Sequence, residues 1–106
     1  MSNVNQEQLE SIMGLIMNAG NAKSDAMEAI HAAKNGQIAT AREKMEIAEK
    51  SVVKAHQSQT ALLTKEASGE SVEMSLLMVH GQDHLMTSIA FCDLAKEVID
   101  IYERIN

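Results

Sequence analysis

Proline is absent from this chain of 106 residues, and its only aromatic side chains are Phe91 and Tyr102. Strands favour β-branched and aromatic residues, whereas alanine, methionine, leucine, glutamate and lysine favour helices. Eight methionines and many alanines stand where other proteins have aromatic residues. Without proline nothing forces a helix to break in its interior. The composition therefore predicts an all-α protein with long helices.

Three further features that the sequence lacks restrict the location and the partners expected for the protein. Cys92 is the only cysteine, so an internal disulfide is impossible and a reduced, cytoplasmic location is expected. No apolar run approaches the roughly 18 residues of a membrane span, and the polar N-terminus lacks the apolar core of a signal peptide. Nine basic against 15 acidic residues give a net charge of −6, which disfavours nucleic acid as a partner.

The first helix is predicted to follow a flexible N-terminal arm, residues 1–5, in which Asn3 or Asn5 provides the N-cap. It extends to about Lys34, because the pair Asn35-Gly36 is typical of a helix C-terminus. Its apolar residues recur at helical spacing. They are Leu9, Ile12, Met13, Ile16, Gly20, Met27 and Ile30.

The second helix is predicted from about Gln37 to Ala67, with charged residues on the face opposite its apolar line. That line comprises Ile38, Ala41, Met45, Ala48, Val52, Ala55, Gln59 and Leu62. The run Ser68–Ser71 is expected to form the next turn, with Gly69 or Ser71 close to the start of the third helix. That helix continues almost to the end of the chain.

The third helix is predicted to be apolar on more than one side. One line of helical spacing comprises Leu77, His80, His84, Thr87, Phe91, Leu94, Val98, Ile101 and Ile105, and a second comprises Leu76, Val79, Asp83, Met86 and Ala90. Short connections make neighbouring helices antiparallel, so a single domain over residues 1–106 with an up-down-up three-helix bundle is expected. Two helices cannot cover every apolar side of the third. We therefore expect an oligomer that uses the surplus face.

Residues 80–84 carry the groups most suited to chemistry. His80 and His84 lie four residues apart, which places them on one face of a helix. They could be core histidines with satisfied hydrogen bonds, metal ligands in a hydrolase that also uses Asp83, or a phosphoryl acceptor and its support. A phosphoryl acceptor needs donors near the phosphoryl oxygens, and Gln82, His84 and His56 are candidates.

Asp83 stands among apolar neighbours, where an isolated carboxylate is costly. It either reaches solvent or converges with two further copies on a threefold axis, where a hard cation such as Mg²⁺ would neutralise the charges. Three other polar residues are expected to make buried contacts between helices: Gln59, Thr87 and Ser88. His31 is interpreted as a surface residue near a helix C-terminus.

Several blocks of this sequence resemble the enzyme IIA component of the lactose/cellobiose (chitobiose) branch of the bacterial sugar phosphotransferase system (PTS). The resemblance covers about residues 9–102, and its most specific part is the block VHGQDHLMT at 79–87. The other blocks are NAGNAKS at 18–24, AHQSQT at 55–60 and ASGE at 67–70.

The resemblance implies a homotrimer whose three subunits form a nine-helix bundle. It implies that His80 accepts a phosphoryl group from the phosphocarrier protein HPr, with Nε2 as the suggested atom, and passes it to a cysteine of the cognate IIB protein. A disaccharide entering through the membrane component IIC would be the final acceptor. Asp83 would match the family's aspartate that binds a divalent metal on the trimer axis, while Gln82 and His84 match the same motif as possible support for the phosphoryl site.

Two other functions compete with this phosphocarrier. Without the resemblance, a helical adaptor or oligomerisation bundle with no transfer activity would rank first, and a metal-dependent hydrolase using His80, Asp83 and His84 would follow. The sequence does not decide which disaccharide is served, and cellobiose or another β-glucoside is preferred to lactose or chitobiose. The identity of the metal and the roles of His56 and Gln59 stay open.

Overall fold

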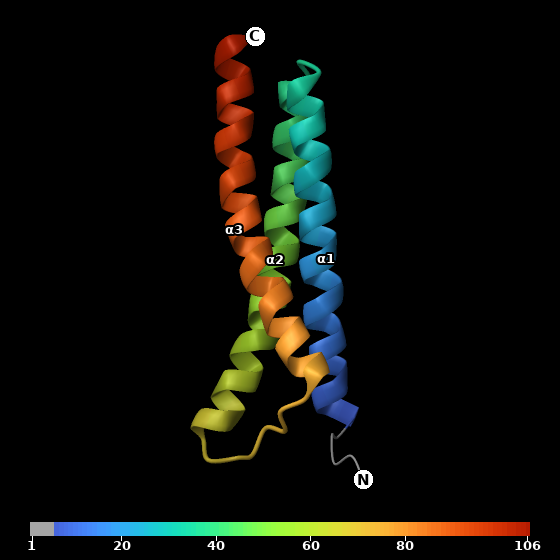
Figure 1. The fold of residues 1–106 in the computed structure, drawn as a ribbon, viewed down its shortest axis with the longest axis vertical. Helices are drawn as coiled ribbons and strands as arrows, with labels where there is room; N and C mark the ends of the chain where they lie inside the picture. Colours follow the sequence, from blue (N-terminus) through green and yellow to red (C-terminus); the bar gives the residue numbers. More distant parts are fainter. Residues whose placement is uncertain (1–5) are drawn as a thin grey trace.

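Three long helices make up the structure, a computed structural model that describes residues 6–106 (Figure 1). They are α1 (Gln6–Lys34), α2 (Ile38–Ala67) and α3 (Leu76–Ile105), arranged up-down-up in a body of 56 × 23 × 17 Å. The all-α prediction is confirmed. The expected arm and its N-cap, Asn3 or Asn5, lie outside the described residues.

The turn between α1 and α2 is fixed by Gly36, as the sequence predicted. Its backbone has a φ of +80°, in the left-handed region that glycine adopts without steric cost. The N–H of Gly36 donates to the carbonyl oxygen of Ala33 at 3.0 Å, and that of Gln37 donates to Ala32 at 2.9 Å. These bonds satisfy carbonyls that the end of a helix leaves free.

The third helix begins later than the sequence predicted. Neither Gly69 nor Ser71 lies at its start, because residues 70–75 have no regular structure and Ser75 is the N-cap. The hydroxyl of Ser75 accepts a hydrogen bond of 3.0 Å from the N–H of Met78. Tertiary contacts hold the intervening loop: Gln8 donates to the carbonyl oxygen of Glu73 at 3.0 Å, and Val72 packs on an apolar cluster.

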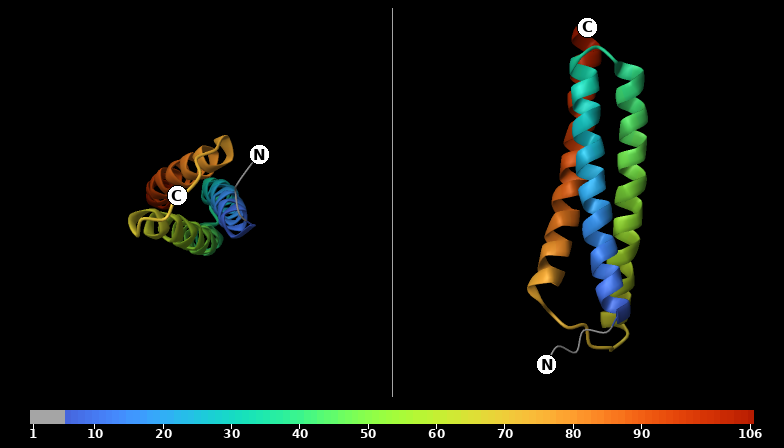
Figure 2. Two further views of the ribbon diagram at one scale, coloured as in Figure 1. Left: turned by 90° about the horizontal axis from the view of Figure 1, so that it is seen from below. Right: turned by 90° about the vertical axis from the view of Figure 1, so that its right-hand side faces the viewer.

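Alanines form most of the core between α1 and α2, which lie side by side along the molecule (Figure 2). The apolar line predicted for α2 is confirmed, with five of its members buried and the other three partly buried. The line predicted for α1 is wrong, because only Ile12 among its members is fully buried. The apolar residues of α1 that are buried are Ile12, Leu15, Ala19, Ala22, Ala26, Ala29 and Ala33. Small side chains allow two helices to approach closely, and the longer side chains flank them.

Helix α3 packs on the other two helices through a face that neither predicted line contains. That face comprises Met78, Gly81, Leu85, Ser88, Cys92, Ala95 and Ile99. In the single subunit most of the two predicted lines is exposed, including Leu76 at 86% of its surface and Ile105 at 71%. A helix that is apolar nearly all round has no period that identifies its inner face. The surplus apolar face that the sequence predicted is present.

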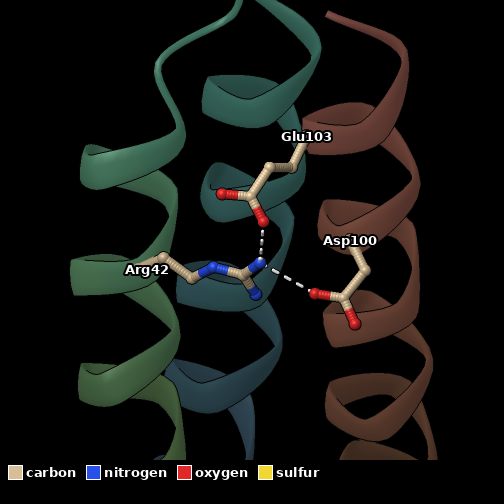
Figure 3. A network of polar contacts seen from close by, with 3 residues as sticks. All are labelled: Arg42, Asp100 and Glu103. Atoms are coloured by element: carbon tan, nitrogen blue, oxygen red, sulfur yellow. Dashed lines mark hydrogen bonds and ion pairs between the residues drawn. The ribbon is translucent and has the colours of Figure 1, made fainter.

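Charged contacts join the helices at the end of the molecule where the chain terminates (Figure 3). The guanidinium group of Arg42 in α2 bonds to Asp100 at 2.8 Å and to Glu103 at 3.0 Å, both in α3. Lys96 and Glu49 make a similar α3–α2 contact at 2.9 Å. All these side chains are substantially exposed, so each pair contributes at most about 1 kcal/mol.

Candidate functional site

His80 and His84 stand on adjacent turns near the start of α3, as their spacing predicted. Their imidazole rings are stacked, with centroids 5.5 Å apart and planes inclined by only 12°. His80 is exposed to solvent and His84 is half-buried. His80 is thus accessible to a partner, and His84 supports one face of its ring.

The ring of His84 is held from α1. The ammonium group of Lys23 lies 3.0 Å from Nδ1 of His84. An ammonium group has donors and no acceptor, so Nδ1 must accept and the neutral ring carries its proton on Nε2. A Cβ atom added at Gly20 would lie 3.4 Å from this Nε2, so the glycine gives the ring room against α1.

The pKa of His84 is lowered from its ordinary value. Burial is the main cause, the positive charge of Lys23 is the second and His80 the third, while Asp83 acts in the opposite direction. All three lowering effects disfavour a charged imidazolium. His84 is therefore a neutral ring in the site near neutral pH.

Gln82 connects the histidine region to α2. The side-chain amide of Gln59 donates a hydrogen bond of 2.6 Å to Oε1 of Gln82, and Nε2 of Gln82 lies 3.7 Å from the sulfur of Met78. Gln59 therefore makes the predicted contact between helices, but the contact is only partly buried. His56 is exposed on α2, and within residues 6–106 it has no hydrogen bond or ring contact with His80 or His84.

Two residues next to the histidines behave differently from each other. Ser88 is completely buried and donates to the carbonyl oxygen of Ala19 in α1 at 2.9 Å, which confirms the predicted contact between helices. Thr87 does not make the buried contact expected of it. It is exposed, and its hydroxyl donates only to carbonyls of its own helix, those of Asp83 and His84. Threonine in a helix commonly bonds in this way to the preceding turn.

Asp83 is exposed in the single subunit, on the side of α3 that α1 and α2 leave uncovered. In the part of the chain that the structure describes, no group of three His, Cys, Asp or Glu side chains could hold a metal ion. His80, Asp83 and His84 therefore do not form a metal centre within one subunit, and the hydrolase hypothesis has no support in the geometry.

Lys23 is the residue of this site that the sequence analysis missed. It lies in the block NAGNAKS, yet a lysine in a helix usually indicates only a solvated surface. Its contact with His84 spans 61 residues of sequence. Lys23 also lines a shallow groove between α1 and α3, together with Ser24, Met27, Thr87 and Phe91. Only the packing of the two helices reveals either relationship.

Comparison with known proteins identifies the family. Residues 10–103 match the family described as "PTS system, Lactose/Cellobiose specific IIA subunit". The chain belongs to this family. It is therefore a phosphocarrier component of the phosphotransferase system, as the resemblance implied, and the adaptor hypothesis is set aside.

Individual relatives cover almost the whole chain of this enzyme IIA component. It is 48% identical over 103 residues to the lichenan-specific phosphotransferase enzyme IIA component of Bacillus subtilis (strain 168), covering 97% of this chain and 94% of the relative. The crystal structure of the cellobiose-specific enzyme IIA from Bacillus anthracis has a TM-score of 0.90 and 43% identity, covering 99% and 93% of the two chains.

A third relative has been solved with a partner. The solution structure of the IIA(chitobiose)–HPr complex from Escherichia coli contains a chain with a TM-score of 0.81 and 38% identity, covering 95% of this chain and 98% of that one. Within residues 6–106 of the present IIA component, no helix is long and apolar enough to cross a membrane.

Proposed function

We propose that His80 is the phosphoryl-accepting residue of this enzyme IIA component and that phosphorylated HPr is the donor. The observation that carries the proposal is the position of His80: it is solvent-exposed, and its ring is stacked on a second imidazole. Recognition of HPr is supported by the solved complex between HPr and the chitobiose relative.

The transfer requires a lone pair on one ring nitrogen of a neutral His80. This lone pair attacks phosphorus, a new P–N bond forms, and the P–N bond to the HPr histidine breaks. The leaving imidazole keeps the electron pair, and the second nitrogen of His80 keeps its proton. Nothing is oxidised or reduced, and no water takes part. Gln82 and His84 are the neighbours available to support the phosphoryl group.

The phosphoryl group then passes to a cysteine of the cognate IIB protein and finally to a disaccharide. In this second step the P–N bond to His80 breaks and a P–S bond forms. A β-glucoside such as cellobiose is our preferred sugar, supported by the lichenan-specific relative and by a cellobiose-specific relative from Lactococcus lactis that is 47% identical. The relay operates in the cytoplasm, where HPr and IIB would meet this enzyme IIA component.

A homotrimer is proposed as the working assembly. Large apolar side chains of α3 lie exposed in the single subunit, among them Val79, Met86 and Leu94. They share the uncovered side of α3 with Asp83, so three subunits that pack through this side bring three carboxylates together. Oxygen ligands of this kind suit Mg²⁺, and the ion would neutralise their mutual repulsion. One carboxylate per chain fits such a site only in the assembled trimer.

A phosphoryl-transfer assay tests the proposed function. The protein is incubated with phosphoenolpyruvate, enzyme I and HPr, and its intact mass is measured. We expect one acid-labile phosphoryl group per chain, absent from His80→Ala and retained by His56→Ala, which removes another exposed histidine. No gain of mass by the wild type, with phosphorylated HPr demonstrated in parallel, would refute the proposal.

A further inference from the structure

Lys23 differs from the other basic residues that the structure places in specific contacts. Arg42, Lys44 and Lys96 each pair with carboxylates. Within residues 6–106 Lys23 takes part in no ion pair, and its ammonium group instead lies 3.0 Å from a ring nitrogen of His84. A neutral partner adds less stability than a carboxylate would, so the contact suggests a role beyond holding α1 against α3.

We propose that Lys23 is a positioning residue of the phosphoryl site, which holds His84 as the Nε2-protonated tautomer with its ring parallel to that of His80. This inference rests on the proposed role of His80 and extends it to α1, because Lys23 acts on the acceptor through His84. The residue does not touch His80 in the structure and is not itself a nucleophile.

The tautomer follows from the donors present. If the neutral ring of His84 carried its proton on Nδ1, two N–H groups would face each other at 3.0 Å and the hydrogen bond would be lost. The same loss follows if the ring rotates by half a turn, because a carbon then faces the ammonium group. Lys23 therefore selects one tautomer and one orientation of the ring.

Gly20 completes this arrangement from the same helix, one turn before Lys23. A Cβ atom at this position would lie 3.4 Å from Nε2 of His84, at the near limit of ordinary van der Waals contact. The backbone of α1 at Gly20 thus lies directly beside the ring that Lys23 orients. The hydroxyl of Ser88 donates to the carbonyl oxygen of His84 at 2.7 Å and fixes the backbone of that residue as well.

The consequence for catalysis concerns the stacked pair of rings. His80 has one face covered by His84, so the orientation of the His84 ring limits the orientations that the acceptor ring can adopt. The Nε2–H of His84 is a hydrogen-bond donor on the ring that is stacked against the acceptor imidazole. The ammonium charge of Lys23 behind this ring favours the negative phosphoryl group.

The test compares Lys23→Met and Lys23→Arg with Lys44→Met, a control that removes an exposed lysine paired with Glu28. Two quantities are measured at about pH 8, where histidines are neutral. The tautomer of His84 is read from its imidazole ¹⁵N–¹H correlations, assigned with a His84→Asn variant. The initial rate of phosphoryl transfer from phosphorylated HPr to the protein is read by intact mass.

In the wild type and in Lys44→Met we expect His84 to be protonated on Nε2 only. In Lys23→Met we expect a mixture of tautomers and a rate that is lower by about tenfold or more, the scale of effect seen when an orienting group is lost. Lys23→Arg keeps a cationic donor. It should therefore recover much of the Nε2-protonated tautomer of His84 and much of the transfer rate. Circular dichroism of each variant establishes that the helices are intact.

An unchanged tautomer in Lys23→Met would overturn the proposal, and so would a transfer rate within about twofold of the wild type. Failure of the proposed function gives a different result. In that case the wild type accepts no phosphoryl group, whereas the spectra still show whether Lys23 orients His84.

Discussion

The hydroxyl of Ser88 in α3 donates a hydrogen bond of 2.9 Å to the backbone carbonyl oxygen of Ala19 in α1. The same hydroxyl lies 2.7 Å from the carbonyl oxygen of His84, one turn earlier in its own helix. Its single proton is shared between two acceptors, one on each helix. Ser88 is completely buried, and it therefore fastens α3 to α1 inside the protein, at the level of the paired histidines.

Replacement of Ser88 by alanine removes this bond with little change in volume. We expect a loss of about 1 kcal/mol in the free energy of unfolding, the usual net contribution of one buried hydrogen bond. Thr87→Ala is the matched control, because Thr87 is exposed and bonds only within α3. Its effect should stay within about 0.5 kcal/mol. Urea unfolding at one protein concentration measures the free energy of unfolding of both variants. An equal decrease in Ser88→Ala and Thr87→Ala would contradict the role given to the Ser88 hydrogen bond.

Replacement of Asp83 by leucine tests the proposed axial metal. We expect the bound divalent ion to be lost while the trimer persists with equal or higher thermal stability, because apolar substitutes for buried ionic groups are often tolerated. Metal analysis by mass spectrometry and molar mass by light scattering provide the two readings. Asp93→Leu, which alters another exposed aspartate of α3, should keep the metal. Dissociation of the Asp83 variant into monomers would contradict this prediction.

Substitution of two glycines by alanine should have opposite effects on stability. Gly36 has a φ of +80°, where an L-residue is strained, so Gly36→Ala should destabilise by about 1 kcal/mol. Gly14 lies inside α1, and an added Cβ would meet only the Ser58 hydroxyl oxygen at 3.8 Å. Gly14→Ala should therefore stabilise by roughly 0.5–1 kcal/mol, because alanine is the better helix former. Thermal unfolding of both variants measures the change in Tm relative to the wild type. Changes of Tm in the same direction would contradict the prediction.

The stability of the fold should depend on the ionisation of Cys92 at alkaline pH. Burial raises the pKa of this thiol, and the negative charges of Glu49 and Asp93 add to the effect, while Lys96 opposes it. The folded protein thus favours the neutral thiol. This contribution is complete below the unfolded pKa of about 8.5 and is lost as pH rises through the folded pKa. As pH rises above about 8.5, the wild type should therefore lose stability more steeply than Cys92→Ala. The free energy of unfolding of both proteins is measured with denaturant at each pH. An equal decrease with pH in the wild type and in Cys92→Ala would refute this prediction.

The helices, one of the turns and the family could all be predicted from the amino-acid sequence. Local preferences are sufficient for these features: Gly36 ends α1 where it was predicted, and the apolar line of α2 packs as predicted because that helix has one clear apolar face. The block around His80 is specific enough to indicate the family on its own, and the family match confirms it. The placement of His80 and His84 on adjacent turns of one helix face follows from their spacing of four residues.

Packing between the helices selects which face of α1 and of α3 turns inward. Large apolar residues lie on several sides of both helices, so hydrophobicity favours Met13 or Met27 over the alanines that close packing actually requires. Packing also sets where α3 begins, because Gln8 binds the loop at Glu73 and delays the helix to the Ser75 cap. The contact between Lys23 and His84 joins residues 61 positions apart on different helices. No local pattern encodes such a pair, since it exists only when α1 and α3 have packed in register.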